Sequence, residues 1–414
     1  MKKSKKNTLW TRDFTIITAG SIVSMVGNAL SGFAMSLFVY DYTQSSLLYA
    51  LYMFLYTLPQ VAVPLLSGPF LDRFSRKKVV YCLDFMSSAI YLVMGFLLLN
   101  GWFSFPVLAV ATFFVGAITS TYTVAYGSLY PLLITEGNYD KAYSVSSILE
   151  TISIMCIPIA ALVYNAIGIG PLFVINGISF LSAAIMETKI HVVETYRKQA
   201  KESAKEVVHQ LVGDFREGIR FLMQDRGLLC IVGYFFFAQV AAGAANVITM
   251  PYFKSNYENG EFWYIAVWGF SMVGRLVGGG IQYRIKIPAS KKFLISVIAY
   301  VAAAVLEGVY MYVWLGLMFV MTFACGLCGI VSYNIRLAGT QSYVANEKKG
   351  RFNGIFTTVT TAGMLTGQLL SGVLTEFIRW DFVLSIFMGL AAIAGVVFIG
   401  MNKKYVAPIY NTEA

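Results

Sequence analysis

The sequence is poor in charged residues. Only 13% of its 414 residues are Asp, Glu, Lys or Arg, whereas soluble domains carry about 25%. A water-soluble fold of this length needs far more polar side chains to cover its surface, so a soluble globular protein is excluded. With 57% hydrophobic residues and a mean hydropathy of +0.67, the composition is typical of a membrane protein.

Histidine and cysteine are also scarce, with two and five copies. Both histidines, His191 and His209, lie in a polar middle segment, so a histidine-based metal site is not expected. No two cysteines suit a disulfide in an external loop. Cys325 and Cys328 have a spacing found in redox and metal motifs, but their apolar, Gly-rich surroundings favour small residues at a helix contact. We therefore expect neither a cofactor nor a metal.

Long hydrophobic runs are abundant instead. Each approaches the roughly 20 apolar residues that a helix needs to cross a bilayer, and the alternating pattern of outer-membrane strands does not occur. We predict an all-α membrane protein with twelve transmembrane helices, near residues 14–40, 46–68, 79–100, 104–132, 142–166, 169–187, 227–252, 261–283, 293–312, 314–338, 352–376 and 382–401.

The formal net charge of +10 follows the topology of a membrane protein. With the N-terminus inside, 28 of the 31 Lys and Arg residues fall on the inner side, as the positive-inside rule requires. We expect a multi-pass protein of the cell membrane with both termini in the cytoplasm, surrounded by membrane lipid. No nucleic-acid partner is expected, because topology accounts for the charge.

The hydrophobic runs divide into two halves. Residues 1–187 hold six expected spans, residues 227–414 hold six more, and residues 188–226 are polar. Apolar residues recur at helical spacing within this linker, at Val207, Leu211, Phe215 and Leu222, which predicts an amphipathic helix on the inner membrane surface. Two six-helix repeats are typical of secondary transporters, whose substrate site lies between the repeats near mid-membrane.

The loop after the second expected span carries a family resemblance. It resembles the major facilitator signature G-x-x-x-D-R-x-x-R-K-[KR], and its matching residues are Gly68, Asp72, Arg73, Arg76, Lys77 and Lys78. Asp84 resembles an acidic residue that follows this loop in a subfamily of exporters. Residues 11–47 and 213–229, and Gly350 to Phe352, are similar to the macrolide-efflux and enterobactin-exporter branch. The resemblance implies two pseudo-symmetric six-helix bundles and transport by alternating access.

The resemblance also implies roles for the signature loop. In the family this loop latches the cytoplasmic ends of the second and eleventh helices in the outward-facing state, so Asp72 is expected near Arg351. The alternative is that its basic residues only hold topology. The sequence departs from proton-coupled drug antiporters at Asn28, where many relatives have an acid, and in lacking Arg or Lys in the fourth span. Proton coupling therefore stays open.

Three ionisable residues inside expected spans are good functional candidates, because charge within the bilayer is costly and usually functional. They are Glu150, Arg275 and Glu307. Glu150 and Arg275 lie at similar depths in the fifth and eighth spans, which meet between the halves in this fold. We predict a Glu150–Arg275 ion pair that acts as a gate, with Glu150 as a candidate proton site. The alternatives are a static pair, or two charges that separately face water.

The resemblance implies that the first, fourth, seventh and tenth helices line the substrate cavity. Polar and aromatic candidates on these helices and their neighbours are Asn28, Tyr122, Tyr126, Gln239, Asn246, Trp268, Tyr333 and Asn334. The alternative is that each packs between helices. Glycines such as Gly274, Gly278, Gly279, Gly280, Gly363, Gly367 and Gly372 are expected at close helix contacts.

These features predict a monomeric secondary transporter that exports a small amphiphilic compound, such as a drug, an antibiotic or a siderophore, with or without protons. A lipid or lysolipid flippase and a nutrient importer are alternatives with the same fold. A membrane-embedded enzyme is disfavoured, because no nucleophile–base spacing occurs in the spans. A receptor or scaffold is disfavoured because little of the chain lies outside the spans.

Overall fold

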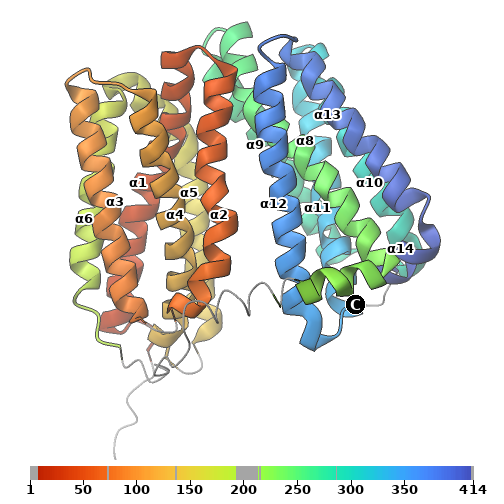
Figure 1. Cartoon of the computed structure of the whole chain (residues 1–414), viewed down its shortest axis with the longest axis horizontal. Helices are drawn as coiled ribbons and strands as arrows, with labels where there is room; N and C mark the ends of the chain where they lie inside the picture. The colour runs from red at the N-terminus through yellow and green to blue at the C-terminus, as the bar shows by residue number, and fades with distance from the viewer. Residues whose placement is uncertain are drawn as a thin grey trace, which may run out of the picture. The chain divides into compact units, whose positions relative to one another are not determined.

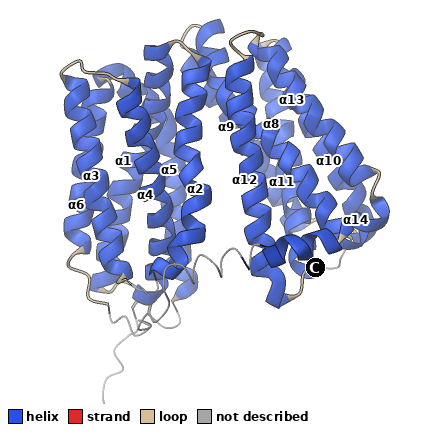
Figure 2. Cartoon of the chain, viewed as in Figure 1, coloured by secondary structure: helices blue, strands red, loops and turns tan. Residues whose placement is uncertain are grey.

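The computed structural model describes residues 8–71, 74–135, 138–192, 213, 216–285 and 287–411. Within these ranges every regular element is a helix and none is a strand (Figure 2). The predicted all-α fold class is therefore confirmed.

The first half of the chain forms long helices joined by short loops (Figure 1). They are α1 (Arg12–Thr43), α2 (Ser46–Leu71), α3 (Arg76–Leu99), α4 (Phe105–Leu129) with the 3-10 turn η1 (Tyr130–Leu133), α5 (Tyr139–Ile167) and α6 (Ile169–Glu187). The second half contains α8 (Arg226–Asn256), α9 (Gly260–Arg284), α10 (Ala289–Val309) with η2 (Tyr310–Tyr312), α11 (Leu315–Tyr343), α12 (Asn346–Leu374), α13 (Trp380–Ala394) with the π-helical turn η3 (Gly395–Gly400), and α14 (Lys403–Tyr410).

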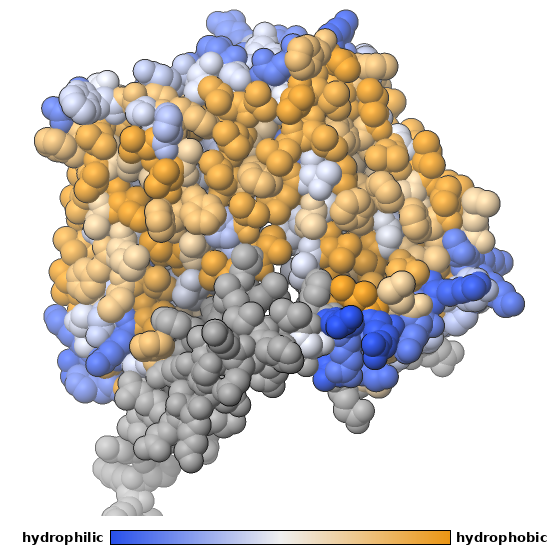
Figure 3. All heavy atoms as spheres, viewed as in Figure 1, coloured by the Kyte–Doolittle hydropathy of each residue, from blue (hydrophilic) through white to orange (hydrophobic). Residues whose placement is uncertain are grey.

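Ten of these helices are long and apolar enough to cross a membrane. The helices α2 and α12 occupy the other two positions where spans were expected, and α2 contributes a shorter apolar stretch, Ser46–Val61. On the face shown in Figure 3, apolar side chains cover the middle of the helices and polar side chains gather at their ends. This distribution is typical of helices whose middle faces lipid.

Helix starts follow ordinary capping chemistry. The Thr11 hydroxyl accepts a hydrogen bond from the Phe14 amide at 3.2 Å, and the Ser75 hydroxyl accepts one from Lys78 at 3.2 Å. The Asp225 carboxylate accepts one from the Leu228 amide at 3.0 Å. Each bond satisfies an amide that has no partner within the first turn of a helix, so the boundaries of α1, α3 and α8 follow from local sequence.

The chain divides into two compact units. The first contains Met1–Gln44 and Leu55–Val208, and the second contains Ser45–Phe54 and His209–Ala414. In the described part of the linker, residues 216–224 are helical. Leu222 is buried in a hydrophobic cluster of the second unit. The remainder of the predicted amphipathic helix, including Val207, Leu211 and Phe215, lies outside the described residues.

Glycines allow helices to approach within backbone contact in both units. In the first unit, a side chain at Gly27 of α1 would collide with Asn176 and Ser179 of α6. In the second unit, Gly363 and Gly367 of α12 lie against the backbone of α8. Five of the seven glycines expected at close helix contacts meet this prediction, namely Gly274, Gly278, Gly363, Gly367 and Gly372. The prediction is wrong for Gly279 and Gly280, because neither has a heavy atom closer than 4.0 Å to the position of an added Cβ.

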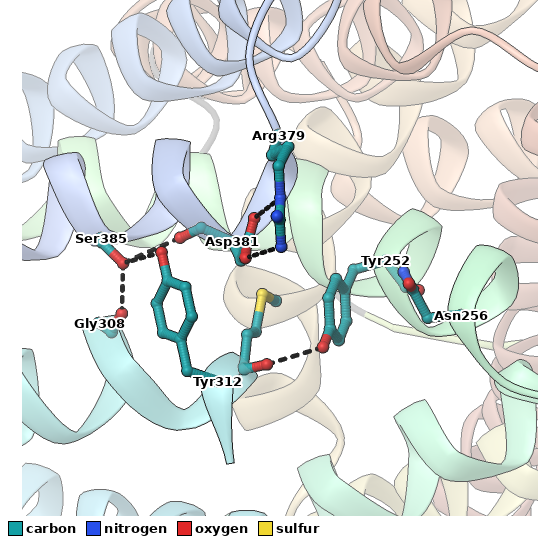
Figure 4. A network of polar contacts seen from close by, with 8 residues as sticks. Tyr252, Asn256, Gly308, Tyr312, Arg379, Asp381 and Ser385 are labelled. Carbon is teal, nitrogen blue, oxygen red and sulfur yellow. Dashed lines mark hydrogen bonds and ion pairs between the residues drawn. The ribbon is translucent and has the colours of Figure 1, made fainter. Parts of the chain in front are cut away.

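A polar network joins α8, α10 and α13 at one end of the second unit (Figure 4). The Ser385 hydroxyl lies 2.6 Å from the Gly308 carbonyl oxygen and 3.2 Å from the Tyr312 hydroxyl. The Tyr252 hydroxyl donates to the Met311 carbonyl at 2.8 Å. These bonds satisfy carbonyls left free where α10 ends, so they fix the turn that leads into α11.

The residues after the last expected span fold into α14, whereas the sequence analysis treats them as a plain tail. Tyr410 is fully buried, and its hydroxyl lies 3.1 Å from that of Tyr300 in α10. Burial raises the pKa of Tyr410 well above its usual value near 10, so the hydroxyl stays neutral. The C-terminal helix is therefore part of the core of the second unit.

Candidate functional site

The first unit encloses a cavity of about 390 Å³ between α1, α3, α4 and α5. It brings together residues that the sequence placed in separate categories. Asn28, Tyr122 and Tyr126 were predicted to bind substrate, and Asp84 and Glu150 to take part in gating; all five line this cavity. A volume of this size holds a small organic molecule or part of a larger one.

Aromatic rings form one wall of the cavity. Tyr122, Tyr126 and Tyr130 follow one another at four-residue spacing, so they lie on one face of α4 and η1. Their rings stack at centroid distances of 5.6 and 5.4 Å, and Tyr143 meets Tyr130 edge-on at 6.0 Å. The Ser21 hydroxyl of α1 donates to the Tyr126 hydroxyl at 2.9 Å. The wall is therefore flat and apolar with hydroxyls at its edges.

The charge of the cavity is acidic. Asp84 is 1% exposed, whereas the side chain of Glu150 is exposed. None of the described residues that line the cavity is Lys or Arg. The Asn28 amide oxygen accepts a hydrogen bond from the Tyr91 hydroxyl at 3.3 Å. The arrangement suits a ligand with an apolar body and a donor or cationic group.

Glu187, which the sequence analysis did not single out, lies beside Asp84. It is the last residue of α6 and only 1% exposed, and its carboxyl group lies within hydrogen-bonding reach of that of Asp84. In the sequence, Glu187 follows an apolar run and precedes the polar Thr188 and Lys189, a pattern that indicates the polar end of a span. Helical spacing places Glu187 on the same face as Asn176 and Ala183, and this is the signal in the sequence that indicates an inward-facing side chain.

The signature loop is only partly described. Gly68 lies within α2, and Asp72 and Arg73 lie outside the described residues, so the predicted latch stays a prediction. Arg76 donates through Nη1 to the Ser128 carbonyl at 3.1 Å, and Lys77 donates to the Thr188 carbonyl at 2.9 Å. These bonds tie the start of α3 to the ends of α4 and α6.

Arg275 of α9 has an acidic neighbour inside its own unit. Its charge attracts that of Glu307 in α10, and the carboxylate of Glu307 also acts on the Cys325 thiol of α11. An added Cβ at Gly329 of α11 would lie 3.9 Å from Arg275 Nη2. Glu150 belongs to the other unit, so its pairing with Arg275 stays a prediction.

The other predicted substrate residues lie on three helices of the second unit. Asn334 of α11 donates to the Gln282 side chain of α9 at 2.7 Å, which is the helix-packing alternative. In α8, Gln239 is half-buried and Asn246 is exposed, and Trp268 of α9 is half-buried.

Arg336 is a charged residue that the sequence analysis did not single out. It lies within α11, 8% exposed, and its Nε has no hydrogen-bond partner among the described residues. Its guanidinium carbon lies 4.6, 5.1 and 5.0 Å from the ring centroids of Phe356, Phe235 and Tyr333. Three aromatic faces therefore stabilise the cation in place of an acid.

Helices of this length and a polar, aromatic cavity inside a six-helix unit define a multi-pass membrane transporter. The sequence pattern of the Major Facilitator Superfamily matches residues 17–335. The chain belongs to this superfamily.

Individual relatives agree with this assignment. The chain is 27% identical over 355 residues to an uncharacterized MFS-type transporter, YkuC, of Bacillus subtilis (strain 168), covering 83% of this chain and 81% of the relative. It is 24% identical over 387 residues to macrolide efflux protein A of Streptococcus pyogenes, covering 89% and 90%.

Solved structures show the same fold. The nucleoside transporter NupG matches with a TM-score of 0.67 at 14% identity, covering 94% of this chain and 98% of that structure. A bacterial homologue of the iron transporter ferroportin matches with a TM-score of 0.67 at 15% identity, covering 93% and 97%. At these identities the likeness concerns the fold alone.

Proposed function

We propose that this transporter exports small amphiphilic molecules by alternating access, and that the cavity of the first unit holds the substrate. The observation that carries the proposal is the lining of this cavity. Stacked tyrosines offer an apolar face, and Asp84 and Glu150 offer acidic groups with no Lys or Arg beside them. The relationship to macrolide efflux protein A supports export and a bulky amphiphilic substrate.

We infer that both termini face the cytoplasm, because the excess of Lys and Arg lies on the corresponding segments. In this orientation the signature loop is cytoplasmic and Asp72 and Arg73 act as a latch during alternating access. The protein works as a monomer. Single cysteines introduced at Asn100 and Lys403 test the orientation. A membrane-impermeant thiol reagent added outside intact cells should label the first position and leave the second unlabelled.

Transport itself is tested with purified protein in liposomes. A panel of cationic dyes, macrolides and fluorescent lysolipids is offered with and without an imposed proton gradient. We expect protein-dependent movement of at least one cationic amphiphile. Glu150→Gln should slow it about tenfold or more, because the cavity loses an acidic group that faces the substrate. Glu258→Gln is the matched control, since Glu258 is exposed in the loop between α8 and α9.

The panel also separates the alternatives. Movement of lysolipids without movement of dyes or macrolides would identify a lipid flippase and contradict the proposal. Uptake of small hydrophilic nutrients with no amphiphile moved would identify an importer. Equal transport rates for wild type and Glu150→Gln would contradict the proposal that this cavity holds the transported substrate.

A further inference from the structure

Two acidic side chains meet in the interior of the first unit. Asp84 of α3 and Glu187 of α6 are each 1% exposed, and their carboxyl groups lie within hydrogen-bonding reach of one another. The contact lies where α3 packs against α6. Gly20 of α1 borders it as well, because an added Cβ there would lie 3.5 Å from Glu187 Oε1, an ordinary van der Waals distance. The carboxyl group of Glu187 is therefore enclosed by three helices.

The pair has fewer hydrogen-bond donors than acceptors. Among the described residues, no regular hydrogen bond reaches either oxygen of Glu187 or Oδ2 of Asp84. The buried Tyr122 hydroxyl lies beside Glu187 and can supply one donor. Three acceptor atoms and a single hydroxyl donor are therefore enclosed together. Buried polar groups are almost always satisfied, so this combination needs an explanation.

Among the described residues, no Lys or Arg lines the cavity that Asp84 borders. From α1 the facing residues are Gly20 and Ser21, and from α4 they are Tyr122 and Tyr126, whose hydroxyls are neutral. From α5 the one charged residue that shares the cavity with Asp84 is Glu150, also an acid.

Two of the three basic residues at the start of α3 form bonds with the ends of other helices. Arg76 and Lys77, two turns before Asp84 on α3, donate to the carbonyls of Ser128 and Thr188. Two ionised carboxylates in contact would repel each other in surroundings of low dielectric, with no counter-charge to offset the loss of hydration. One bound proton removes a charge and supplies the missing donor.

We propose that Asp84 and Glu187 together bind one proton, as a carboxylic acid that donates to the neighbouring carboxylate, and that this pair is the proton site of the transporter. Proton binding converts two carboxylates into one acid and one carboxylate, and release restores both. Asp84 also lines the cavity, so a cationic substrate there competes electrostatically with the proton. The competition rests on the proposed function, whereas proton binding does not.

The proposal assigns to this pair the role that the sequence suggested for Glu150. The reason is burial: the side chain of Glu150 is exposed, whereas Asp84 and Glu187 are enclosed by other side chains, where a lone charge is costly. Assigning the proton to Asp84 and Glu187 or to Glu150 predicts loss of the protonated-carboxyl infrared band in different variants.

The test is infrared spectroscopy of the full-length protein in lipid at neutral pH, which needs no substrate. A protonated carboxyl group has a C=O stretching band that a carboxylate lacks. We expect the difference spectrum of wild type minus Asp84→Asn/Glu187→Gln to show the band of about one protonated carboxyl per protein. Glu187→Gln alone should also lose the band, because its amide donates to Asp84 and leaves that carboxylate ionised. Glu150→Gln, the matched control, should keep it.

A wild-type band that survives in both Glu187→Gln and the double variant would overturn the proposal, as would its loss in Glu150→Gln. Replacing choline chloride with sodium chloride is a further arm: loss of the band in sodium would identify a sodium site and contradict proton binding. If one variant fails to insert, the other still decides, since each is expected to lose the band. Absence of transport for every substrate would challenge the proposed function and leave this measurement unaffected.

Discussion

The guanidinium of Arg336 lies 4.6 Å from the ring centroid of Phe356, and this contact joins α11 to α12. Phe235 of α8 faces the same guanidinium at 5.1 Å. A buried charge normally has an acidic partner, and here aromatic faces take that place. Since a planar guanidinium stacks on rings better than an ammonium does, lysine is a poor substitute.

We therefore predict an energetic coupling between Arg336 and Phe356. Arg336→Lys, Phe356→Leu and the double variant form a thermodynamic cycle, measured as free energies of unfolding in detergent micelles. The coupling should be about 1 kcal/mol in favour of the native pair. Phe352→Leu in place of Phe356→Leu is the control, because the rings that face Arg336 among the described residues are those of Phe235, Tyr333 and Phe356. Strictly additive losses would contradict a cation–π role.

The contact of α1 with α6 predicts different effects on stability when two glycines of α1 are replaced by alanine. Gly27→Ala places a methyl group against Asn176 and Ser179, whereas the methyl of Gly32→Ala meets no atom within 4 Å. Overpacking of this kind costs about 1–3 kcal/mol. Gly27→Ala should lower the thermal unfolding midpoint by several degrees, and Gly32→Ala should leave it unchanged. Equal midpoints would mean that α1 and α6 do not pack as described.

The surroundings of Arg275 predict which acidic residue, when changed to Arg, compensates for a charge reversal at position 275. Arg275→Glu should impair transport, because it places a second acid near Glu307. If Glu307 is the partner, Arg275→Glu/Glu307→Arg restores a large part of the rate and Arg275→Glu/Glu150→Arg does not. Recovery only in the second combination would favour the Glu150–Arg275 pair of the sequence analysis.

The burial of α14 predicts that the C-terminal helix is structural. Tyr410→Ala removes a fully buried ring and the hydroxyl contact with Tyr300, and large-to-small changes at such sites cost about 3–5 kcal/mol. Its thermal unfolding midpoint should fall far more than that of Lys403→Ala, a change at an exposed position of the same helix. A midpoint unchanged in both variants would show that α14 does not contribute to the core.

The sequence by itself determined the features that depend on local chemistry. The lengths of the hydrophobic runs set the helices, since about 20 apolar residues suit a bilayer and a helix satisfies its own backbone. The end of α6 at Glu187 matches the expected span. Signature residues such as Arg76 and Lys77 indicated the superfamily, and the family match confirms it. These properties are readable because each lies within one short stretch of chain.

The tertiary structure alone decided which polar groups meet. Asp84 and Glu187 are more than 100 residues apart in the chain, and they meet because α3 packs against α6. Arg336 is surrounded by rings from α8, α11 and α12, which only the packing of these helices brings together. The packing partners of a helix decide which of its faces points inward. When a helix is hydrophobic on nearly every side, its sequence carries little information about which face that is.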